Sequence, residues 1–243
     1  MTHIIAHSRR WLARLPSDCP LCGLRAAGGR LCEPCAAEAM AALGPATPRC
    51  LRCAVRLAPR ARHCADCLRL RPAYRRVVAA LDYAGPYRGL ISRYKTACRH
   101  LLALALADLM LRAIRQADPP LRGPCLLVPV PASAASLRQR GFNPAAELAA
   151  ALAARLGWPL ARTQLRPARA LAGRQTLRGR RDRLRGATGR WRALPLPAGA
   201  TVALVDDVVT TGATAHGAAR ALLAAGAGCV IVLAAARTPA SHG

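Results

Sequence analysis

The chain of 243 residues has few acidic residues, few aromatic residues and almost no lysine. It carries 11 Asp and Glu against 37 Lys and Arg, which gives a formal charge of +26, and Lys95 is its only lysine. Coding bias explains the use of arginine in place of lysine, but it does not explain the excess of positive charge. A field of this sign favours polyanions such as nucleic acid, or an anionic membrane surface. Because only 3% of residues are aromatic, phosphate contacts would dominate such binding over base stacking.

Long apolar runs are also missing. Residues 1–16 contain scattered His and Arg, so we expect no signal peptide. The longest uncharged apolar run, Ala221–Ala236, is broken by Gly226 and Gly228 and is shorter than the roughly 18 residues of a membrane span. We therefore expect no membrane span and a cytoplasmic location. In that compartment, closely spaced cysteines bind metal more often than they form disulfides.

Cysteine, in contrast, is abundant near the N-terminus. Eight of the 11 cysteines form four Cys-x-x-Cys pairs: Cys19/Cys22, Cys32/Cys35, Cys50/Cys53 and Cys64/Cys67. A two-residue spacer lets both sulfurs face one ion, and two pairs complete the four-thiolate site that structural zinc prefers. The spacing predicts two structural zinc ions, with consecutive pairs sharing one ion, although interleaved pairs stay an alternative. An iron–sulfur cluster and a redox dithiol are further alternatives.

The composition changes near residues 71–76. The part before this point is rich in Cys, Pro and Arg, and the part after it is rich in Ala, Leu and Val. We therefore expect a small metal-binding domain over residues 1–75 and a second domain over residues 76–243. The three isolated cysteines of the second domain are expected in its core: Cys98, Cys125 and Cys229.

The second domain alternates strand patterns with helix patterns. Strands are expected at 77–83, 125–131, 200–206 and 229–235, with a short one at 159–165. Helices are expected at 100–116, 144–156 and 214–225, and residues 132–142 are expected to form a loop. This alternation predicts an open, mostly parallel α/β sheet that binds ligands at the carboxyl ends of its strands.

The segment Val202–Thr214 carries the clearest chemical signal. An apolar strand pattern leads into two carboxylates, Asp206 and Asp207, and then into the turn Thr210-Thr-Gly-Ala-Thr214. The free N–H groups of a helix start, the threonine hydroxyls and the close backbone approach at Gly212 suit a phosphate. The carboxylates suit hydroxyl donors such as those of a ribose. Walker A and Rossmann patterns do not fit the segment, and an ordinary capped turn would not need paired acids.

This segment resembles the phosphoribosyl pyrophosphate (PRPP) motif of type I phosphoribosyltransferases. In that family the acidic pair contacts the ribose hydroxyls and the turn holds the 5-phosphate. The resemblance implies a PRPP site made by the following residues: Asp206, Asp207, Thr210, Thr211, Gly212, Ala213 and Thr214. It also implies Mg²⁺, bound together with PRPP.

The cysteine pairs and the segments Tyr83–Arg88, Ile91–Lys95, Val128–Pro131 and Arg138–Asn143 extend the resemblance to nearly the whole chain. Together with the PRPP motif they resemble the ComF family of competence-associated proteins. This resemblance implies a type I phosphoribosyltransferase-like α/β domain behind a double zinc ribbon, and a role in DNA uptake or natural transformation. Other DNA-uptake proteins would then be partners.

Two basic residues join the site. In related transferases the loop after the second strand binds pyrophosphate, and the planar guanidinium of Arg140 suits paired phosphate oxygens. Lys95, as the only lysine of the chain, is assigned a phosphate contact and a catalytic role together with Asp206 and Asp207. The pattern weakens over residues 165–190, where an Asn and a Phe of the family are missing. This stretch corresponds to the loop that closes over the active site.

Two functions follow as hypotheses. The first is an Mg²⁺-dependent transferase, in which a nucleophile displaces pyrophosphate from PRPP. The second is a non-catalytic accessory protein that binds single-stranded DNA and keeps a vestigial PRPP site. The acceptor and the oligomeric state stay open.

Overall fold

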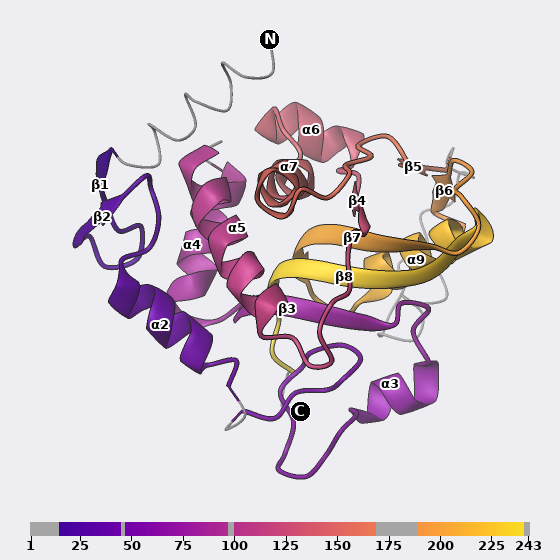
Figure 1. The fold of residues 1–243 in the computed structure, drawn as a ribbon, viewed down its shortest axis with the longest axis horizontal. Coiled ribbons are helices and arrows are strands. Elements are labelled where there is room, and N and C mark those ends of the chain that lie inside the picture. Colours follow the sequence, from indigo (N-terminus) through magenta and orange to yellow (C-terminus); the bar gives the residue numbers. More distant parts are fainter. Residues whose placement is uncertain (1–14, 45–46, 97–99, 169–188, 241–243) are drawn as a thin grey trace.

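The computed structural model describes residues 15–44, 47–96, 100–168 and 189–240. Its centre is a four-stranded sheet in the order β3-β8-β7-β4 (Figure 1), and each neighbouring pair of strands is parallel. The strands are β3 (Arg76–Asp82), β4 (Leu126–Pro129), β7 (Ala200–Val209) and β8 (Ala227–Arg237). Because both faces of a parallel sheet are covered, its strands are apolar on both sides. The sequence-based prediction of a mostly parallel α/β domain is confirmed.

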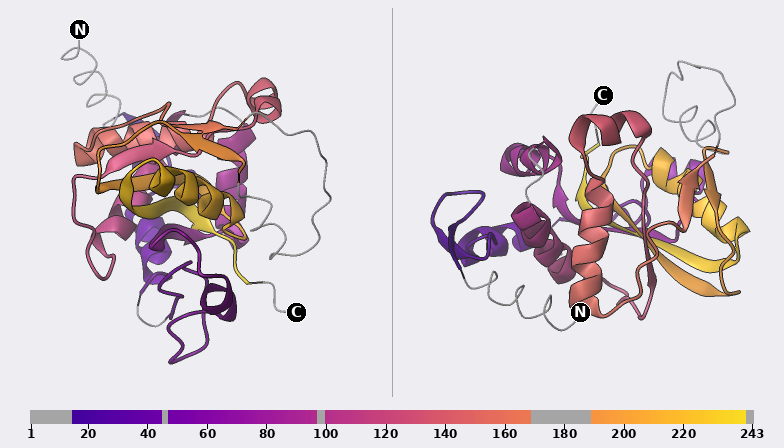
Figure 2. Two further views of the ribbon diagram at one scale, coloured as in Figure 1. Left: turned by 90° about the vertical axis from the view of Figure 1, so that its right-hand side faces the viewer. Right: turned by 90° about the horizontal axis from the view of Figure 1, so that it is seen from above.

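Helices cover the two faces of this sheet (Figures 1 and 2). One face packs against α4 (Gly85–Thr96), α5 (His100–Arg115) and α7 (Pro144–Leu156), and the other against α9 (Ala213–Ala224). A short antiparallel pair, β5 (Leu165–Pro167) with β6 (Trp191–Ala193), lies beside α9. Helix α7 begins and ends as the sequence predicts, with the Asn143 side chain accepting from the Ala145 N–H and Gly157 in the left-handed conformation.

Three local predictions need correction. Residues 132–142 do not form a plain loop, because they contain the helix α6 (Ala134–Arg140). None of its residues is buried, so its sequence lacks the regular spacing of apolar residues by which a helix is predicted. Only part of the strand expected at 159–165 forms: Leu160 bridges Leu127, and Leu165 begins β5. Strand β7 does not end at the acidic pair, since its pairing with β8 continues as far as Val209.

The N-terminal region contains two cysteine-rich ribbons. The first holds the antiparallel pair β1 (Pro16–Asp18) and β2 (Arg25–Ala27), followed by α2 (Glu33–Ala41), and the second holds α3 (Ala65–Leu70). Helix α2 contributes Ala36, Ala39 and Met40 to the same core as α5 and α7. The ribbons therefore pack onto the α/β domain, and the division at residue 75 stays a prediction.

The isolated cysteines of the second domain differ in burial. Cys125 is fully buried, as predicted, while Cys229 is half-buried at the edge of the core. Cys98 lies outside the described residues, as do residues 169–188, most of the stretch in which the family pattern weakens. Within the described part of the chain, no helix has the length and apolar character that crossing a membrane requires.

Candidate functional site

The eight paired cysteines form two groups of four thiols. Within each group the sulfur atoms all lie within 4.8 Å of one another. The first group is Cys19, Cys22, Cys32 and Cys35, and the second is Cys50, Cys53, Cys64 and Cys67. Each group thus combines consecutive pairs, as the sequence predicts, and the interleaved arrangement does not occur.

Both groups begin with the same local fold. The Gly23 N–H donates to the Cys19 carbonyl at 2.9 Å, and the Ala54 N–H donates to the Cys50 carbonyl at the same distance. In both turns the residue after the second cysteine has a positive φ, 78° at Gly23 and 58° at Ala54. Glycine adopts this conformation freely, whereas alanine does so at a cost. The repetition indicates two ribbons of one kind.

The chemistry of the thiols fits a metal ion. Hydrogen bonds from the Cys53 and Cys67 thiols lower the pKa of the Cys50 thiol. Burial alone would raise the pKa of Cys19, but backbone N–H groups, first that of Cys22, outweigh it and lower this pKa to about 6. The pKa of other thiols in both groups is raised, by burial and by the neighbouring sulfurs. A cation is therefore needed for all four thiols of a group to ionise, and thiolates are the form that binds zinc. Each group offers four sulfur ligands, so both groups could hold structural zinc.

The acidic pair of the PRPP motif lies near the carboxyl end of β7, where α4 brings Lys95 against it. Nζ of Lys95 is 3.1 Å from Oδ2 of Asp207, and both side chains are largely buried. Helix α4 is held in place by Tyr94, whose hydroxyl donates to the Pro144 carbonyl at the start of α7, 2.6 Å away. The structure therefore brings together two of the residues that the sequence assigns to catalysis.

Asp206 has a different environment from Asp207. Burial raises the pKa of Asp206 well above its usual range, and the neighbouring carboxylate of Asp207 adds to the increase. The Asp207 N–H, which donates to Oδ1 of Asp206 at 2.9 Å, and the charge of Lys95 act in the opposite direction. The acid thus favours its protonated form until a cation or a hydroxyl donor compensates its charge.

The turn after β7 has the geometry that the motif predicts. Gly212 has a φ of 79° and forms the N-cap of α9. Its carbonyl accepts from the His216 N–H at 2.8 Å, and Oγ1 of Thr211 accepts from the Ala213 N–H at 3.3 Å. Thr210 and Thr214 are exposed. The start of α9 thus combines free N–H groups, threonine hydroxyls and the positive end of the helix dipole. This arrangement is suited to binding a phosphate.

Arg140 lies on a neighbouring element of the same sheet edge. Strand β4 ends beside β7, where the Val130 N–H donates to the Val205 carbonyl at 2.9 Å. Helix α6 follows directly and carries Arg140, a half-buried side chain, at its last position. The placement at the carboxyl edge agrees with the assigned pyrophosphate contact, which stays a prediction.

Reasoning from sequence missed the residues that support the turn from behind. A Cβ atom at Gly212 would lie 2.8 Å from the hydroxyl oxygen of Tyr74, a side chain that is 1% exposed. The Ala73 N–H donates to Nδ1 of His216 at 3.0 Å. Arg237, at the end of β8, donates to the Val209 and Thr210 carbonyls. No motif marks these residues, and only their three-dimensional position identifies them.

A cavity of about 340 Å³ lies away from this site, between the first ribbon and helices α5 and α7. Its arginines Arg30 and Arg155 both pair with Asp108, at 2.9 and 2.5 Å. Arg112 in the same lining pairs with Glu33. Three of the four arginines that line the cavity are thus already ion-paired, and we interpret them as contacts that join the ribbon to the domain.

Comparison with known proteins agrees with this geometry. Residues 136–243 match the model of the phosphoribosyl transferase domain. The DNA utilization protein YhgH of Salmonella typhimurium is 32% identical over 231 residues, which cover 94% of this chain and 96% of that protein. YhgH of Escherichia coli K12 is 35% identical over 72% of this chain and 78% of its own length.

Competence protein F of Haemophilus influenzae is 30% identical over 69% of this chain and 75% of its own length. A solved structure, that of TT1426 from Thermus thermophilus, aligns at 19% identity over 58% of this chain and 85% of that chain. Its TM-score of 0.34 is too low to support an argument. The relatives, the matched domain and the two four-cysteine groups together show that the chain belongs to the ComF family, the family of competence protein F and YhgH.

Proposed function

We propose that the chain binds PRPP at the carboxyl edge of its sheet. The 5-phosphate would lie on the turn Thr210–Thr214, and the ribose hydroxyls would donate to Asp206 and Asp207. The observation that carries the proposal is the 3.1 Å contact between Lys95 and Asp207. It places the only lysine of the chain, from a distant segment, beside the acid of the motif.

The charges of the site suit a ligand that has anionic ends and a neutral sugar. Lys95 compensates one carboxylate in the free protein, while burial raises the pKa of Asp206. A ribose diol supplies hydrogen-bond donors to both acids, and Lys95 can then turn to a phosphate oxygen. Mg²⁺, if bound with PRPP, would supply positive charge against the pyrophosphate oxygens.

The chemistry that fits such a site is transfer of the phosphoribosyl group. The bond between C1 of the ribose and the pyrophosphate oxygen breaks, the electron pair leaves with the pyrophosphate, and the acceptor forms a new bond to C1. Positive charge develops on the sugar ring, which the carboxylates of Asp206 and Asp207 would stabilise. Arg140 would hold the departing pyrophosphate through its paired N–H groups. The described residues do not select an acceptor.

A role in DNA uptake or use follows from the relatives. The proteins named competence protein F and DNA utilization protein share most of this chain's length. We therefore propose that this chain serves natural transformation or a related use of DNA, with other proteins of that process as partners and with its action inside the cytoplasm.

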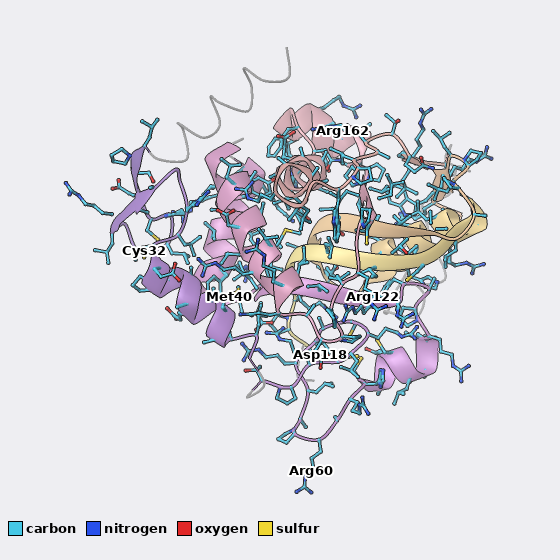
Figure 3. The ribbon with its side chains drawn as sticks, in the orientation of Figure 1. Cys32, Met40, Arg60, Asp118, Arg122 and Arg162 are labelled. Carbon is cyan, nitrogen blue, oxygen red and sulfur yellow. The ribbon has the colours of Figure 1, made fainter. Side chains whose placement is uncertain are left out.

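Binding of single-stranded DNA is a second candidate, supported by the surface of the second ribbon. Between residues 56 and 75, six arginines are exposed: Arg56, Arg60, Arg62, Arg69, Arg71 and Arg75. Arg60 extends from the tip of a loop (Figure 3), and Asp66 is the only acid in this stretch. Such a surface suits a phosphate backbone, whose binding releases counterions.

Two titrations test these candidates. Calorimetry with PRPP and Mg²⁺ is expected to give binding at one site, and ribose 5-phosphate is expected to bind more weakly because it lacks the pyrophosphate. Fluorescence titration with a single-stranded oligonucleotide at two salt concentrations is expected to show a steep loss of affinity at the higher salt. An affinity that does not depend on salt would contradict the DNA proposal.

A further inference from the structure

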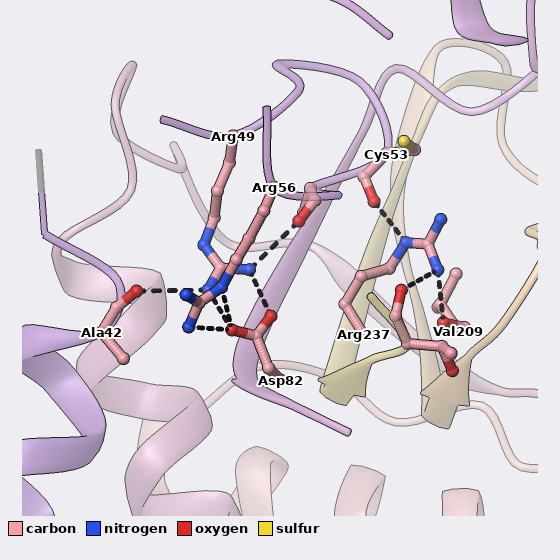
Figure 4. A network of polar contacts seen from close by, with 9 residues as sticks. Ala42, Arg49, Cys53, Arg56, Asp82, Val209 and Arg237 are labelled. Atoms are coloured by element: carbon pink, nitrogen blue, oxygen red, sulfur yellow. Dashed lines mark hydrogen bonds and ion pairs between the residues drawn. The ribbon is translucent and has the colours of Figure 1, made fainter. Parts of the chain in front are cut away.

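Arg237 joins the second four-cysteine group to the proposed phosphate turn. It is the last residue of β8 and is 2% exposed. Its Nε donates to the Cys53 carbonyl at 2.8 Å, and its Nη1 donates to the Val209 carbonyl at 3.0 Å and to the Thr210 carbonyl (Figure 4). One buried guanidinium thus bridges a cysteine ligand loop and the first residues of the turn.

The hydrogen bonds of Arg237 are unusual for a buried charge. All those that the structure gives for this side chain go to backbone carbonyls, including that of Thr238 at 2.8 Å. A buried charge is costly unless its hydrogen bonds are satisfied. The guanidinium therefore holds the carbonyls around it. Loss of the Cys53 carbonyl would leave the buried Nε–H without a partner, and loss of the Val209 and Thr210 carbonyls would leave Nη1 with the Thr238 carbonyl alone.

These bonds determine which way the N–H groups of the turn point. In a planar trans peptide the C=O and the following N–H point in opposite directions. Because the Thr210 carbonyl faces Arg237, the Thr211 N–H faces away from it. The Val209 carbonyl, which also accepts from the Thr238 N–H at 3.0 Å, orients the Thr210 N–H in the same way. The turn can then offer these N–H groups to a phosphate.

The second ribbon supports the same turn at further points. Tyr74 lies behind Gly212, and the Ala73 N–H bonds to His216 in the first turn of α9. The backbone of the ribbon also joins the sheet, since the Val77 N–H donates to the Arg52 carbonyl at 2.8 Å. The first ribbon contacts other elements: Arg112 of α5 donates to both carboxylate oxygens of Glu33.

We propose that Arg237 is a positioning residue through which the second four-cysteine site controls the affinity of the PRPP turn. With a metal ion on its four thiolates, the site fixes the Cys53 carbonyl, and this carbonyl holds Arg237 against Val209 and Thr210. Loss of the metal frees the carbonyl and releases the turn. Oxidation by hydrogen peroxide has the same effect: two thiols lose their protons and two electrons and form one S–S bond, the O–O bond of the peroxide breaks to give two water molecules, and the metal ion is released. The expected effect on affinity rests on the proposed function, with PRPP as the ligand of that turn. The structural link from the cysteine site through Arg237 to the turn does not depend on the identity of the ligand.

The test compares the buried Arg237 with Arg155, a partly buried arginine. Arg237→Gln removes the bridge, while Arg155→Gln removes a guanidinium that bonds to Asp108 and to the Ala151 carbonyl, away from the turn. Hydrogen exchange of the free, zinc-loaded protein is measured at the Thr238 and His216 amides, which donate to the Val209 and Gly212 carbonyls. We expect faster exchange there in Arg237→Gln and unchanged exchange in Arg155→Gln. Equal exchange at these amides in both variants would overturn the inference.

A second variant tests the coupling from the metal side and remains informative if Arg237→Gln does not fold. Cys64→Ser removes one ligand of the second group, and we expect one zinc per chain in place of two. The same amides should exchange faster, and the affinity for PRPP with Mg²⁺ should fall by about 5- to 150-fold, the usual range of coupling between two sites. Unchanged exchange and unchanged affinity after loss of that zinc would refute the coupling.

The two proposals can fail separately. If the wild-type chain does not bind PRPP but the exchange at Thr238 and His216 rises in Cys64→Ser, the proposed ligand is wrong and the mechanical coupling stands. If the wild type binds PRPP and neither variant changes the exchange or the affinity, the ligand is right and the coupling is wrong.

Discussion

Lys95 and Asp207 form an ion pair with 3.1 Å between Nζ and Oδ2, and this pair connects α4 to the acidic end of β7. The two residues lie far apart in the sequence, and no local pattern links them. Their contact closes one side of the proposed ribose site. It also means that the free protein already holds a cation where the ligand's charged groups are expected.

Replacing Lys95 tests its part in binding. Lys95→Gln should weaken PRPP binding by roughly tenfold or more, since hydrogen bonds to charged groups contribute about 1.5–3 kcal/mol. Lys95→Arg should recover only part of the affinity, because a guanidinium is not a compact ammonium. Calorimetry measures both. Arg88→Gln, which changes an exposed cation on the same helix, is the control and should bind PRPP as the wild type does.

The raised pKa of Asp206 predicts a pH-dependent stability. A carboxyl whose pKa is higher in the folded state stabilises the fold below its unfolded pKa, and this contribution is lost as the pH rises through the folded pKa. Asp206→Asn should therefore raise the melting temperature at pH 7, and the gain should shrink toward pH 4. Melting curves across this range provide the check. If Asp206→Asn had a lower melting temperature than the wild type at pH 7, the contacts of the ionised Asp206 carboxylate would outweigh the cost of burying its charge.

Gly212 and Gly199 separate backbone strain from loss of the phosphate site. Both have a φ of 79°, so alanine at either position is strained. At Gly212 the new Cβ would also lie 2.8 Å from the Tyr74 hydroxyl oxygen, whereas at Gly199 nothing lies within 4 Å. Backbone strain should lower the free energy of unfolding by about 1–2 kcal/mol in both variants, and the contact with Tyr74 should lower it further in Gly212→Ala. Only Gly212→Ala should also weaken PRPP binding by more than tenfold. Equal affinities in the two variants would argue against close contact between this turn and a phosphate.

The cysteine groups predict two zinc ions per chain, because eight thiolates complete two tetrahedral sites. Elemental analysis of the purified protein should find two zinc ions and no iron.

Chelation should also weaken the α/β domain, because the second ribbon supplies two arginines to the buried Asp82 at the end of β3. Arg49 and Arg56 donate to the Asp82 carboxylate at 2.8 and 2.6 Å (Figure 4). Breaking a buried ion pair costs about 3–5 kcal/mol. A chain that keeps its full melting temperature without metal would contradict this dependence.

Much of the fold follows from the sequence, because local patterns specify it. The continuous apolar run Val202–Val205 predicts a parallel strand buried on both faces, and Asn143, Pro144 and Gly157 mark the ends of α7. The end of β7 is not predicted correctly, because its last residues are held by pairing with β8, which extends to Val209 and Arg237. Pairing between distant strands leaves no signal in either segment alone.

The candidate site shows the same limit. The motif residues Asp206 to Thr214 can be found from sequence because they are contiguous and chemically distinctive. Arg237 and Tyr74 cannot, since one arginine in an arginine-rich chain and one tyrosine at the end of the second ribbon carry no pattern. Their roles depend on burial and on contacts between segments far apart in the sequence.

Calorimetry on matched proteins measures whether the acidic pair binds the ribose of PRPP. PRPP with Mg²⁺ is titrated into the wild type and into the double variant Asp206→Asn, Asp207→Asn, with circular dichroism to verify the fold. We expect binding to the wild type and a loss of affinity of at least about a hundredfold in the double variant, since two charge-assisted contacts are removed. Equal affinity in a folded double variant, or no binding to the wild type, would show that the acidic pair does not bind the ribose of PRPP.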